Sequence, residues 1–217
     1  MLRRRSGRDH EQTILFACGR LDGRCGGGRR LSAPAAGLAT RAFWFLRHGE
    51  TDWNAQNRSQ GNVDIPLNAA GLAQARVAAG LLAHRGIVTL VSSPLSRARV
   101  TAEIVAAAIG VAVSFDDGLH EAAFGVEEGQ PMTAWFADWI AGVATPAEAE
   151  TFAALRVRAT AAINRALARP APVLVVAHGA LFRAVRAEMG LAPNVRTPNA
   201  TPLFCTPGAP WTLTPAG

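Results

Sequence analysis

The sequence predicts an α/β fold, a three-layer sandwich in which a mostly parallel, doubly wound sheet has helices on both faces. The first observation is a set of short apolar runs at residues 43–46, 88–91, 111–115 and 173–177. These runs are continuous and rich in β-branched or aromatic residues, as is typical of strands buried on both faces. The second observation is that segments with helical spacing separate the runs, and this alternation favours a parallel sheet.

The first two predicted helices follow the first two strands. Residues 69–85 place apolar side chains from Leu72 to Leu82 on one face, and Asn68 is the expected N-cap. Residues 95–109 follow the sequence S-S-P, which suggests Ser93 as the cap of a second helix and Pro94 as its first residue.

Three more helices and two strands complete the prediction. Trp135 and Trp139 are four residues apart, which suits a helix whose aromatic side chains line the core or a pocket. A long helix rich in Ala and Arg is expected at 147–169, before a proline, and a shorter one at 180–189, before a glycine. Two segments near the end, residues 203–206 and 211–214, are expected to be edge strands.

The charge distribution divides the chain into an extension, residues 1–41, and a domain, residues 42–217. The extension contains nine arginines and three acidic residues, whereas the domain contains 13 of each, and the chain has no lysine. We expect the Arg- and Gly-rich extension to be disordered, because it cannot bury enough apolar surface to fold. The domain has no excess of positive charge that would attract nucleic acid, so no nucleic-acid partner is expected.

The remaining bulk properties predict a cytoplasmic globular protein. No apolar stretch approaches the roughly 18 residues of a membrane span, and no secretory signal is recognisable. Cys18, Cys25 and Cys205 match no metal-ligand spacing, and their odd number favours a reducing compartment. We therefore expect no membrane association, and the sequence leaves the oligomeric state open.

Charged side chains follow three of the predicted strands. The first strand runs into Arg47, His48 and a glycine, the second leads to Arg97 on the first helical turn, and the fourth runs into His178 and Gly179. Ligands of open α/β sheets bind beyond the carboxyl ends of the strands. Two histidines and two arginines should therefore meet at one edge of the sheet, near helix N-termini that suit a phosphate.

Metal binding by His48 and His178 is the main alternative reading of these strand ends. The neighbouring arginines would repel a cation, and no carboxylate or cysteine lies at ligand spacing. We therefore expect neither a metal nor another cofactor.

Five motifs in this order resemble the histidine phosphatase superfamily, also called the phosphoglycerate mutase-like group. They are R-H-G-E-T-x-W-N, Q-G-x-x-D-x-P-L-x-x-x-G-x-x-Q-A, S-S-P-L-x-R-A-x-x-T-A, L-x-E-x-x-F-G-x-x-E-G and a late A-H-G. The resemblance extends from about residue 42 to about residue 190. It implies the phosphoglycerate mutase-like fold and an enzyme that forms a phosphohistidine intermediate.

The resemblance also implies a role for each matched side chain. His48 would be the nucleophile, and its other ring nitrogen would donate to a backbone carbonyl. The nucleophile must be neutral, a state that nearby arginines favour by like-charge repulsion. Arg47, Arg97 and His178 would hold the phosphoryl oxygens, and Glu121 would be the proton donor. The expected substrate-binding residues are Asn54, Gln60, Gly61, Gly179 and Ala180.

The absence of two features predicts whether the chain is a mutase or a phosphatase of this family. Phosphoglycerate mutases of this family carry a lysine and paired arginines after the acid motif, and residues 129–172 have neither. We therefore expect a metal-independent phosphatase acting on a small phosphorylated metabolite. The alternatives are a phosphoglycerate mutase and a non-catalytic relative that binds a phosphorylated ligand. Glu127 stands where the family often has tryptophan, and we expect it near the pocket mouth, where it would disfavour polyanions.

Overall fold

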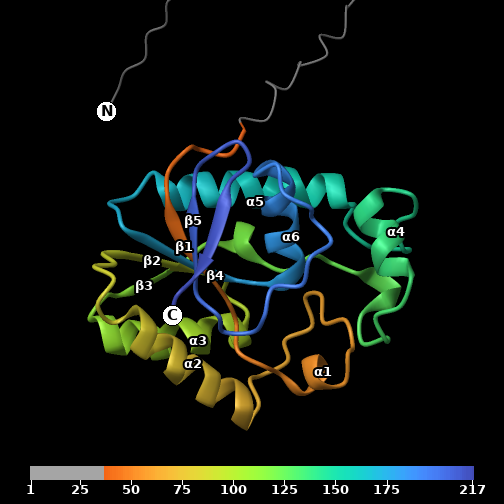
Figure 1. Cartoon of the computed structure of the whole chain (residues 1–217). Coiled ribbons are helices and arrows are strands. Elements are labelled where there is room, and N and C mark those ends of the chain that lie inside the picture. Colours follow the sequence, from red (N-terminus) through yellow and green to blue (C-terminus); the bar gives the residue numbers. More distant parts are fainter. Residues whose placement is uncertain (1–36) are drawn as a thin grey trace, which may run out of the picture. The chain divides into compact units, whose positions relative to one another are not determined.

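The structure is a computed structural model that describes residues 37–217. Apart from residues 37–41, the predicted N-terminal extension lies outside the described residues. Six strands form one mixed sheet in the order β3-β2-β4-β1-β5-β6, with helices on both faces (Figure 1). The predicted α/β sandwich is confirmed.

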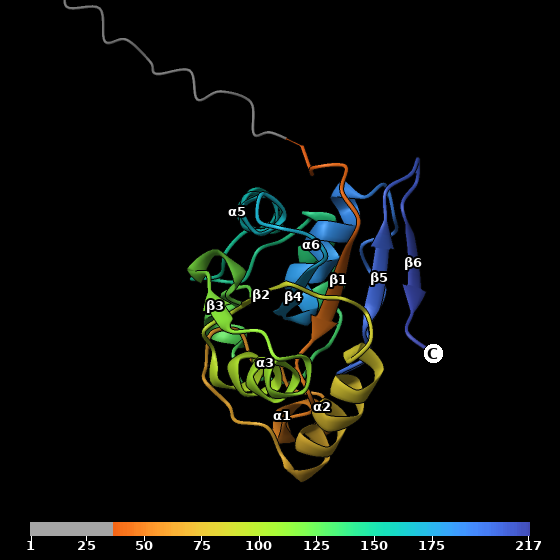
Figure 2. The same ribbon diagram turned by 90° about the vertical axis from the view of Figure 1, so that its left-hand side faces the viewer.

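The first four strands are parallel and the last two are antiparallel. The parallel strands are β1 (Phe43–Arg47), β2 (Thr89–Ser92), β3 (Val113–Phe115) and β4 (Val173–Ala177). An antiparallel hairpin of β5 (Leu203–Thr206) and β6 (Thr212–Pro215) extends the sheet beside β1. Figure 2 shows β6 at the outer edge.

Two predictions about strand position are wrong. Strand β3 is not buried on both faces, because it is the edge strand beside β2 and Phe115 is exposed. Strand β5 is not an edge strand, because it pairs with β1 on one side and β6 on the other. Position in a sheet depends on tertiary pairing, which a short apolar run does not encode.

Helices cover the two faces in separate groups. Helices α2 (Ala69–Leu82) and α3 (Ser96–Ile109) pack together on one face, and α5 (Phe152–Leu167) and α6 (Gly179–Glu188) pack together on the other (Figure 1). The shorter helices are α1 (Asp52–Ala55) and α4 (Trp135–Ala141), with 3-10 turns at Asp117–Leu119 and Gly125–Glu127. No helix among residues 37–217 has the length and apolar character needed to cross a bilayer.

The helix starts confirm one prediction and correct two. The Asn68 side chain caps α2 by accepting from the Gly71 N–H at 2.8 Å. Ser93 does not cap α3, which begins after Leu95 without a side-chain cap. Helix α5 begins five residues later than predicted, and the Thr151 hydroxyl caps it. The segment before it forms a bridge to Phe124 through Ala149, which competes with continued helix.

Alternation along β1 builds two cores that hold the strand rigidly. Phe43 and Phe45 face the α5–α6 side, where Phe45 stacks on Phe182 with ring centroids 3.8 Å apart. Trp44 and Leu46 face the α2–α3 side. All four side chains are buried, so the end of β1 is fixed from both sides.

Candidate active site

Strand register brings the two predicted histidines together. In the parallel pair of β1 and β4, Arg47 lies opposite Ala177, and the His48 N–H donates to the Ala177 carbonyl at 3.0 Å. His48 and His178 are therefore the next residues on neighbouring strands. Their ring centroids are 5.2 Å apart, which confirms the predicted convergence.

The His48 ring is held as a neutral imidazole with one nitrogen free. Its Nδ1 lies 2.7 Å from the Gly49 carbonyl, the contact that would fix the N–H on Nδ1. Burial lowers the pKa of His48 well below 6.5, and the charges of Arg97 and Arg47 add to the effect. The lone pair of Nε2 is therefore available to attack an electrophile.

Gly49 is required by close packing against the α2 N-terminus. A Cβ at this position would lie 2.4 Å from the backbone oxygen of Gly71, far inside normal contact. The tight approach lets the chain turn directly after His48.

Ser93 orients the second histidine. Its Oγ lies 2.7 Å from the His178 Nε2 and also accepts from the Leu95 N–H at 3.4 Å. The hydroxyl proton can then be donated to Nε2, which places the ring proton of His178 on Nδ1. Burial, followed by the charges of Arg97 and His48, lowers the pKa of His178 well below 6.5, so this ring is neutral too.

Arg47 and Arg97 are buried and fixed by backbone carbonyls. The Arg47 Nη1 donates to the Thr197 carbonyl at 2.8 Å. The Arg97 Nη1 and Nη2 donate to the carbonyls of Val63 and Gly61 at 2.9 and 2.7 Å. Burial lowers the pKa of Arg47 to about 10, which leaves it charged at neutral pH.

Three buried nitrogen atoms beside these groups lack partners. Among residues 37–217, the Nε of Arg47, the Nε of Arg97 and the Nδ1 of His178 have no hydrogen-bond partner. Buried polar atoms without partners are rare in folded proteins and need a specific explanation. Two guanidinium donors and one imidazole donor around a buried nucleophile fit the oxygens of a phosphoryl group.

A pocket opens over His48, and most of the predicted residues line it. Its volume is about 740 Å³, counted to the solvent at the mouth. Asn54, Gln60, Gly179 and Ala180 line it as predicted, together with Arg47, Arg97 and Glu121. Gly61 and His178 are not among the lining residues, so the contacts predicted for them with substrate stay predictions. Gly61 holds Arg97 through its carbonyl oxygen.

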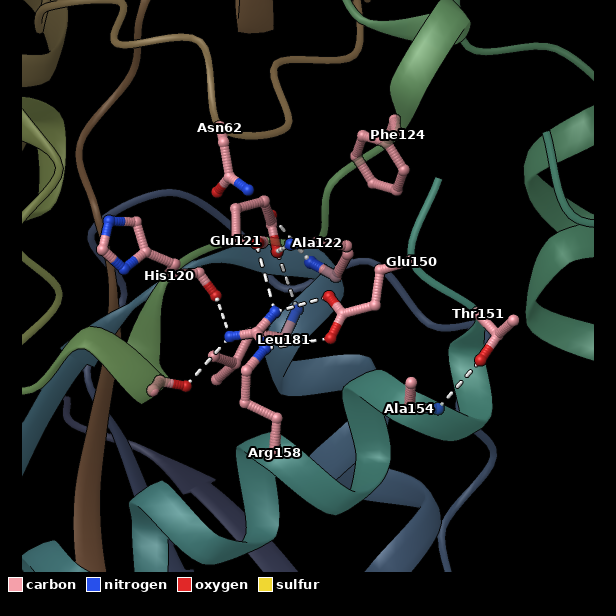
Figure 3. A network of polar contacts seen from close by, with 12 residues as sticks. Asn62, His120, Glu121, Ala122, Phe124, Glu150, Thr151, Ala154, Arg158 and Leu181 are labelled. Atoms are coloured by element: carbon pink, nitrogen blue, oxygen red, sulfur yellow. Dashed lines mark hydrogen bonds and ion pairs between the residues drawn. The ribbon is translucent and has the colours of Figure 1, made fainter. Parts of the chain in front are cut away.

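The carboxylate of Glu121 lies at the start of α6, close to the histidines. Its Oε2 accepts from the Ala180 N–H at 3.0 Å, and its Oε1 accepts from the N–H groups of Leu181 and Ala122 at 2.8 and 3.1 Å (Figure 3). A helix N-terminus offers free N–H groups and a favourable dipole to such an anion. Glu121 is thereby fixed in the wall of the pocket.

Arg158 of α5 holds the backbone around Glu121 through hydrogen bonds to carbonyl oxygens. The Nη1 of Arg158 donates to the carbonyls of Gly118 and His120 at 3.0 and 2.9 Å, and its Nη2 donates to that of Glu121 at 3.3 Å (Figure 3). The same guanidinium makes a bidentate pair with Glu150. Helix α5 therefore positions the loop that carries Glu121.

Comparison with known proteins identifies the family. Residues 43–199 match the sequence profile of the histidine phosphatase superfamily, branch 1. The chain belongs to this superfamily. A curated relative, the probable phosphoglycerate mutase GpmB of Yersinia pestis, is 36% identical over 147 residues, which are 63% of this chain and 68% of the relative.

Similar solved structures agree with this family assignment. A mycobacterial glucosyl-3-phosphoglycerate phosphatase in complex with VO3 superimposes with a TM-score of 0.71 at 28% identity, covering 80% of this chain and 97% of the other. TTHB049 from Thermus thermophilus gives a TM-score of 0.67 at 28% identity, with coverages of 82% and 100%. The predicted resemblance is confirmed.

The pocket of this member of the superfamily also contains residues that the sequence prediction missed. Arg58, Arg183 and Arg196 line it beside the predicted residues. Arg183 follows His178 by five residues, at the second turn of α6, and this spacing could have suggested it. Glu127 does not line the pocket, so the expectation that it disfavours polyanions at the mouth is wrong. Its carbonyl oxygen accepts from the Ser59 hydroxyl within the adjoining loop.

Proposed function

We propose that the protein is a phosphatase that hydrolyses a phosphate monoester of a small metabolite through a phosphohistidine on His48. One observation carries the proposal. The neutral imidazole of His48 has a free Nε2, and it lies near Arg47, Arg97 and His178, each of which has a buried nitrogen atom without a partner. That arrangement offers a nucleophile and an oxyanion-binding ring at one place.

The first step transfers the phosphoryl group to the enzyme. The His48 Nε2 forms a bond to phosphorus as the bond from phosphorus to the ester oxygen breaks. Arg47, Arg97 and His178 hold the three equatorial oxygens, on which negative charge is spread in the transition state. Glu121, which carries a proton when the substrate is bound, donates it to the leaving oxygen, and the alcohol departs.

The second step regenerates the enzyme. Glu121, now ionised, accepts a proton from a water molecule as the water oxygen attacks phosphorus. The bond between phosphorus and the His48 Nε2 breaks, and inorganic phosphate leaves. The reaction consumes one water and needs no redox partner.

The pocket supports a reaction without a metal. Its ionisable lining consists of five arginines, Glu121 and the neutral His48. Cations of this number repel a divalent metal, and one carboxylate is too few to hold it. We expect EDTA to leave the rate unchanged, and strong inhibition would restore the metal alternative.

Phosphoglycerate mutase activity is the second candidate, because the curated relative is named a probable phosphoglycerate mutase. The solved neighbour named a phosphatase, together with the missing lysine and arginine pair, favours hydrolysis. Phosphorus NMR with 3-phosphoglycerate separates the two: a phosphatase releases inorganic phosphate, whereas a mutase accumulates 2-phosphoglycerate.

The direct test is hydrolysis of p-nitrophenyl phosphate by the purified chain and by His48→Asn. Hydrolysis by the wild type and its loss in the variant are expected. A variant with unchanged activity would remove His48 from the mechanism. A wild type without activity on any monoester would favour the non-catalytic alternative.

A further inference from the structure

The lining of the pocket has more positive charge than one phosphate monoester needs. Five arginines and one glutamate give a net charge of +4 when His48 is neutral and Glu121 is ionised, and a higher one when Glu121 carries the proton that it donates. A phosphate monoester contributes about −2 at neutral pH, by analogy with phosphoserine. A surplus of about two positive charges remains on the lining residues, and the carboxylates of Asp64 and Glu128 outside the lining act on Arg97.

The surplus charge belongs to arginines other than Arg47 and Arg97, which are assigned to the phosphoryl group. Arg183 and Arg196 line the pocket, and neither forms a salt bridge with any carboxylate among residues 37–217. Both add to the lowering of the Arg47 pKa, for which burial is the main cause. Their charges therefore act on the same space as the catalytic arginine.

Arg183 is held in a defined position at the pocket wall. Its guanidinium lies over the ring of Phe136, with its Cζ 4.9 Å from the ring centroid. Its Nη1 donates to the side chain of Asn194, in the loop that also carries Arg196 and Thr197. An arginine that is stacked and hydrogen-bonded loses little entropy when it binds an anion.

Arg196 has the opposite character. It is exposed, and its side chain makes no hydrogen bond to the described part of the chain. Arg58, the fifth arginine of the lining, has fewer free donors than Arg183, because its Nε donates to the Gly129 carbonyl at 2.6 Å and its Nη1 to the Gln56 side chain at 3.3 Å. Arg183 and Arg196 are thus the cations best able to receive a second group of the ligand.

We propose that Arg183 and Arg196 form a second anion subsite, which selects phosphate monoesters that also carry a carboxylate or a second phosphate. The proposal rests on the proposed phosphatase site for the position of the first phosphate. The apolar side chains of Phe124, Met132 and Phe136 also line the pocket, and they suit the carbon skeleton of such a ligand.

The test measures equilibrium binding, so that it does not depend on turnover. Isothermal titration calorimetry on His48→Asn compares 3-phosphoglycerate with glycerol 3-phosphate, which differ by a carboxylate in place of a hydroxymethyl group. A second comparison pairs fructose 1,6-bisphosphate with fructose 6-phosphate. We expect the ligand with the second anion to bind about tenfold more tightly in at least one pair.

Arginine variants in the same background decide which residues are responsible. Adding Arg196→Gln or Arg183→Gln should reduce the preference by about tenfold, with a smaller effect on glycerol 3-phosphate. Arg76→Gln, at an exposed position on α2 away from the pocket, should leave the preference unchanged.

The outcomes separate this proposal from the proposed function. Equal affinities within both pairs, or a preference that survives both arginine substitutions, would overturn the subsite even if the enzyme hydrolyses p-nitrophenyl phosphate. A preference that depends on the arginines supports the subsite even if no hydrolysis is found. The pair that shows the preference identifies the second anion.

Discussion

Arg158 and Glu150 form a bidentate ion pair, with nitrogen–oxygen distances of 2.9 and 2.6 Å, directly behind the loop that carries Glu121. The remaining contacts of Arg158 are the carbonyl oxygens of Gly118, His120 and Glu121 itself. The pair therefore connects helix α5 to the proposed proton donor, and its chemical effect should resemble that of Glu121 itself.

Replacing Arg158 by methionine should slow the reaction through Glu121. We expect kcat for an alkyl phosphate to fall about tenfold or more, with a smaller loss for p-nitrophenyl phosphate, whose leaving group needs no proton. Stopped assays on both substrates check this. Arg156→Met, on the same helix with an exposed pair to Glu188, is the control. Equal losses on both substrates would indicate a structural effect alone.

Replacing Glu121 by glutamine removes the transferable proton and keeps the shape of the side chain. Hydrolysis of glycerol 3-phosphate should fall about a hundredfold or more, whereas that of p-nitrophenyl phosphate should change much less. Steady-state kinetics with a series of leaving groups checks this as a steeper dependence on leaving-group pKa. An unchanged dependence would assign proton donation to another group.

The two buried histidines should make stability depend on pH. Their folded-state pKa values are lowered, so the unfolded chain binds more protons below about pH 6.5 and stability falls as the pH decreases. Each should cost up to about 1.4 kcal/mol of unfolding free energy per pH unit below 6.5. Urea unfolding at pH 7.5 and 5.5 measures the loss.

Single substitutions test whether the two buried histidines cause this loss of stability. His178→Asn should reduce the loss between the two pH values, whereas His84→Gln should not, because His84 is exposed. A wild type whose stability is equal at both pH values would contradict neutral, buried rings at both positions.

The parts of the site that could be predicted are those that follow from strand direction. Arg47, His48 and His178 end buried parallel strands, and such ends meet at one edge of a sheet whatever the loops do. Glu121 has no comparable local signal, because it lies in a loop after the edge strand β3. Only its resemblance to the family motif indicated a role.

The parts that were missed depend on contacts between distant segments. Ser93 follows a strand and precedes a proline, the local pattern of a helix cap, yet its hydroxyl contacts His178, 85 residues away. Arg196 lies in a loop without periodic pattern, so nothing in the sequence places it at the pocket. Local propensity describes a segment, whereas these roles arise from its tertiary neighbours.

The central claim is that phosphate is transferred to the Nε2 of His48. Rapid quenching of the enzyme with excess p-nitrophenyl phosphate into alkali, which preserves phosphohistidine, followed by intact and peptide mass spectrometry tests it most directly. We expect the mass of one phosphoryl group, on His48, in Glu121→Gln and to a lesser extent in the wild type. A phosphoryl group on another residue, or none in either protein while phosphate is released, would contradict it.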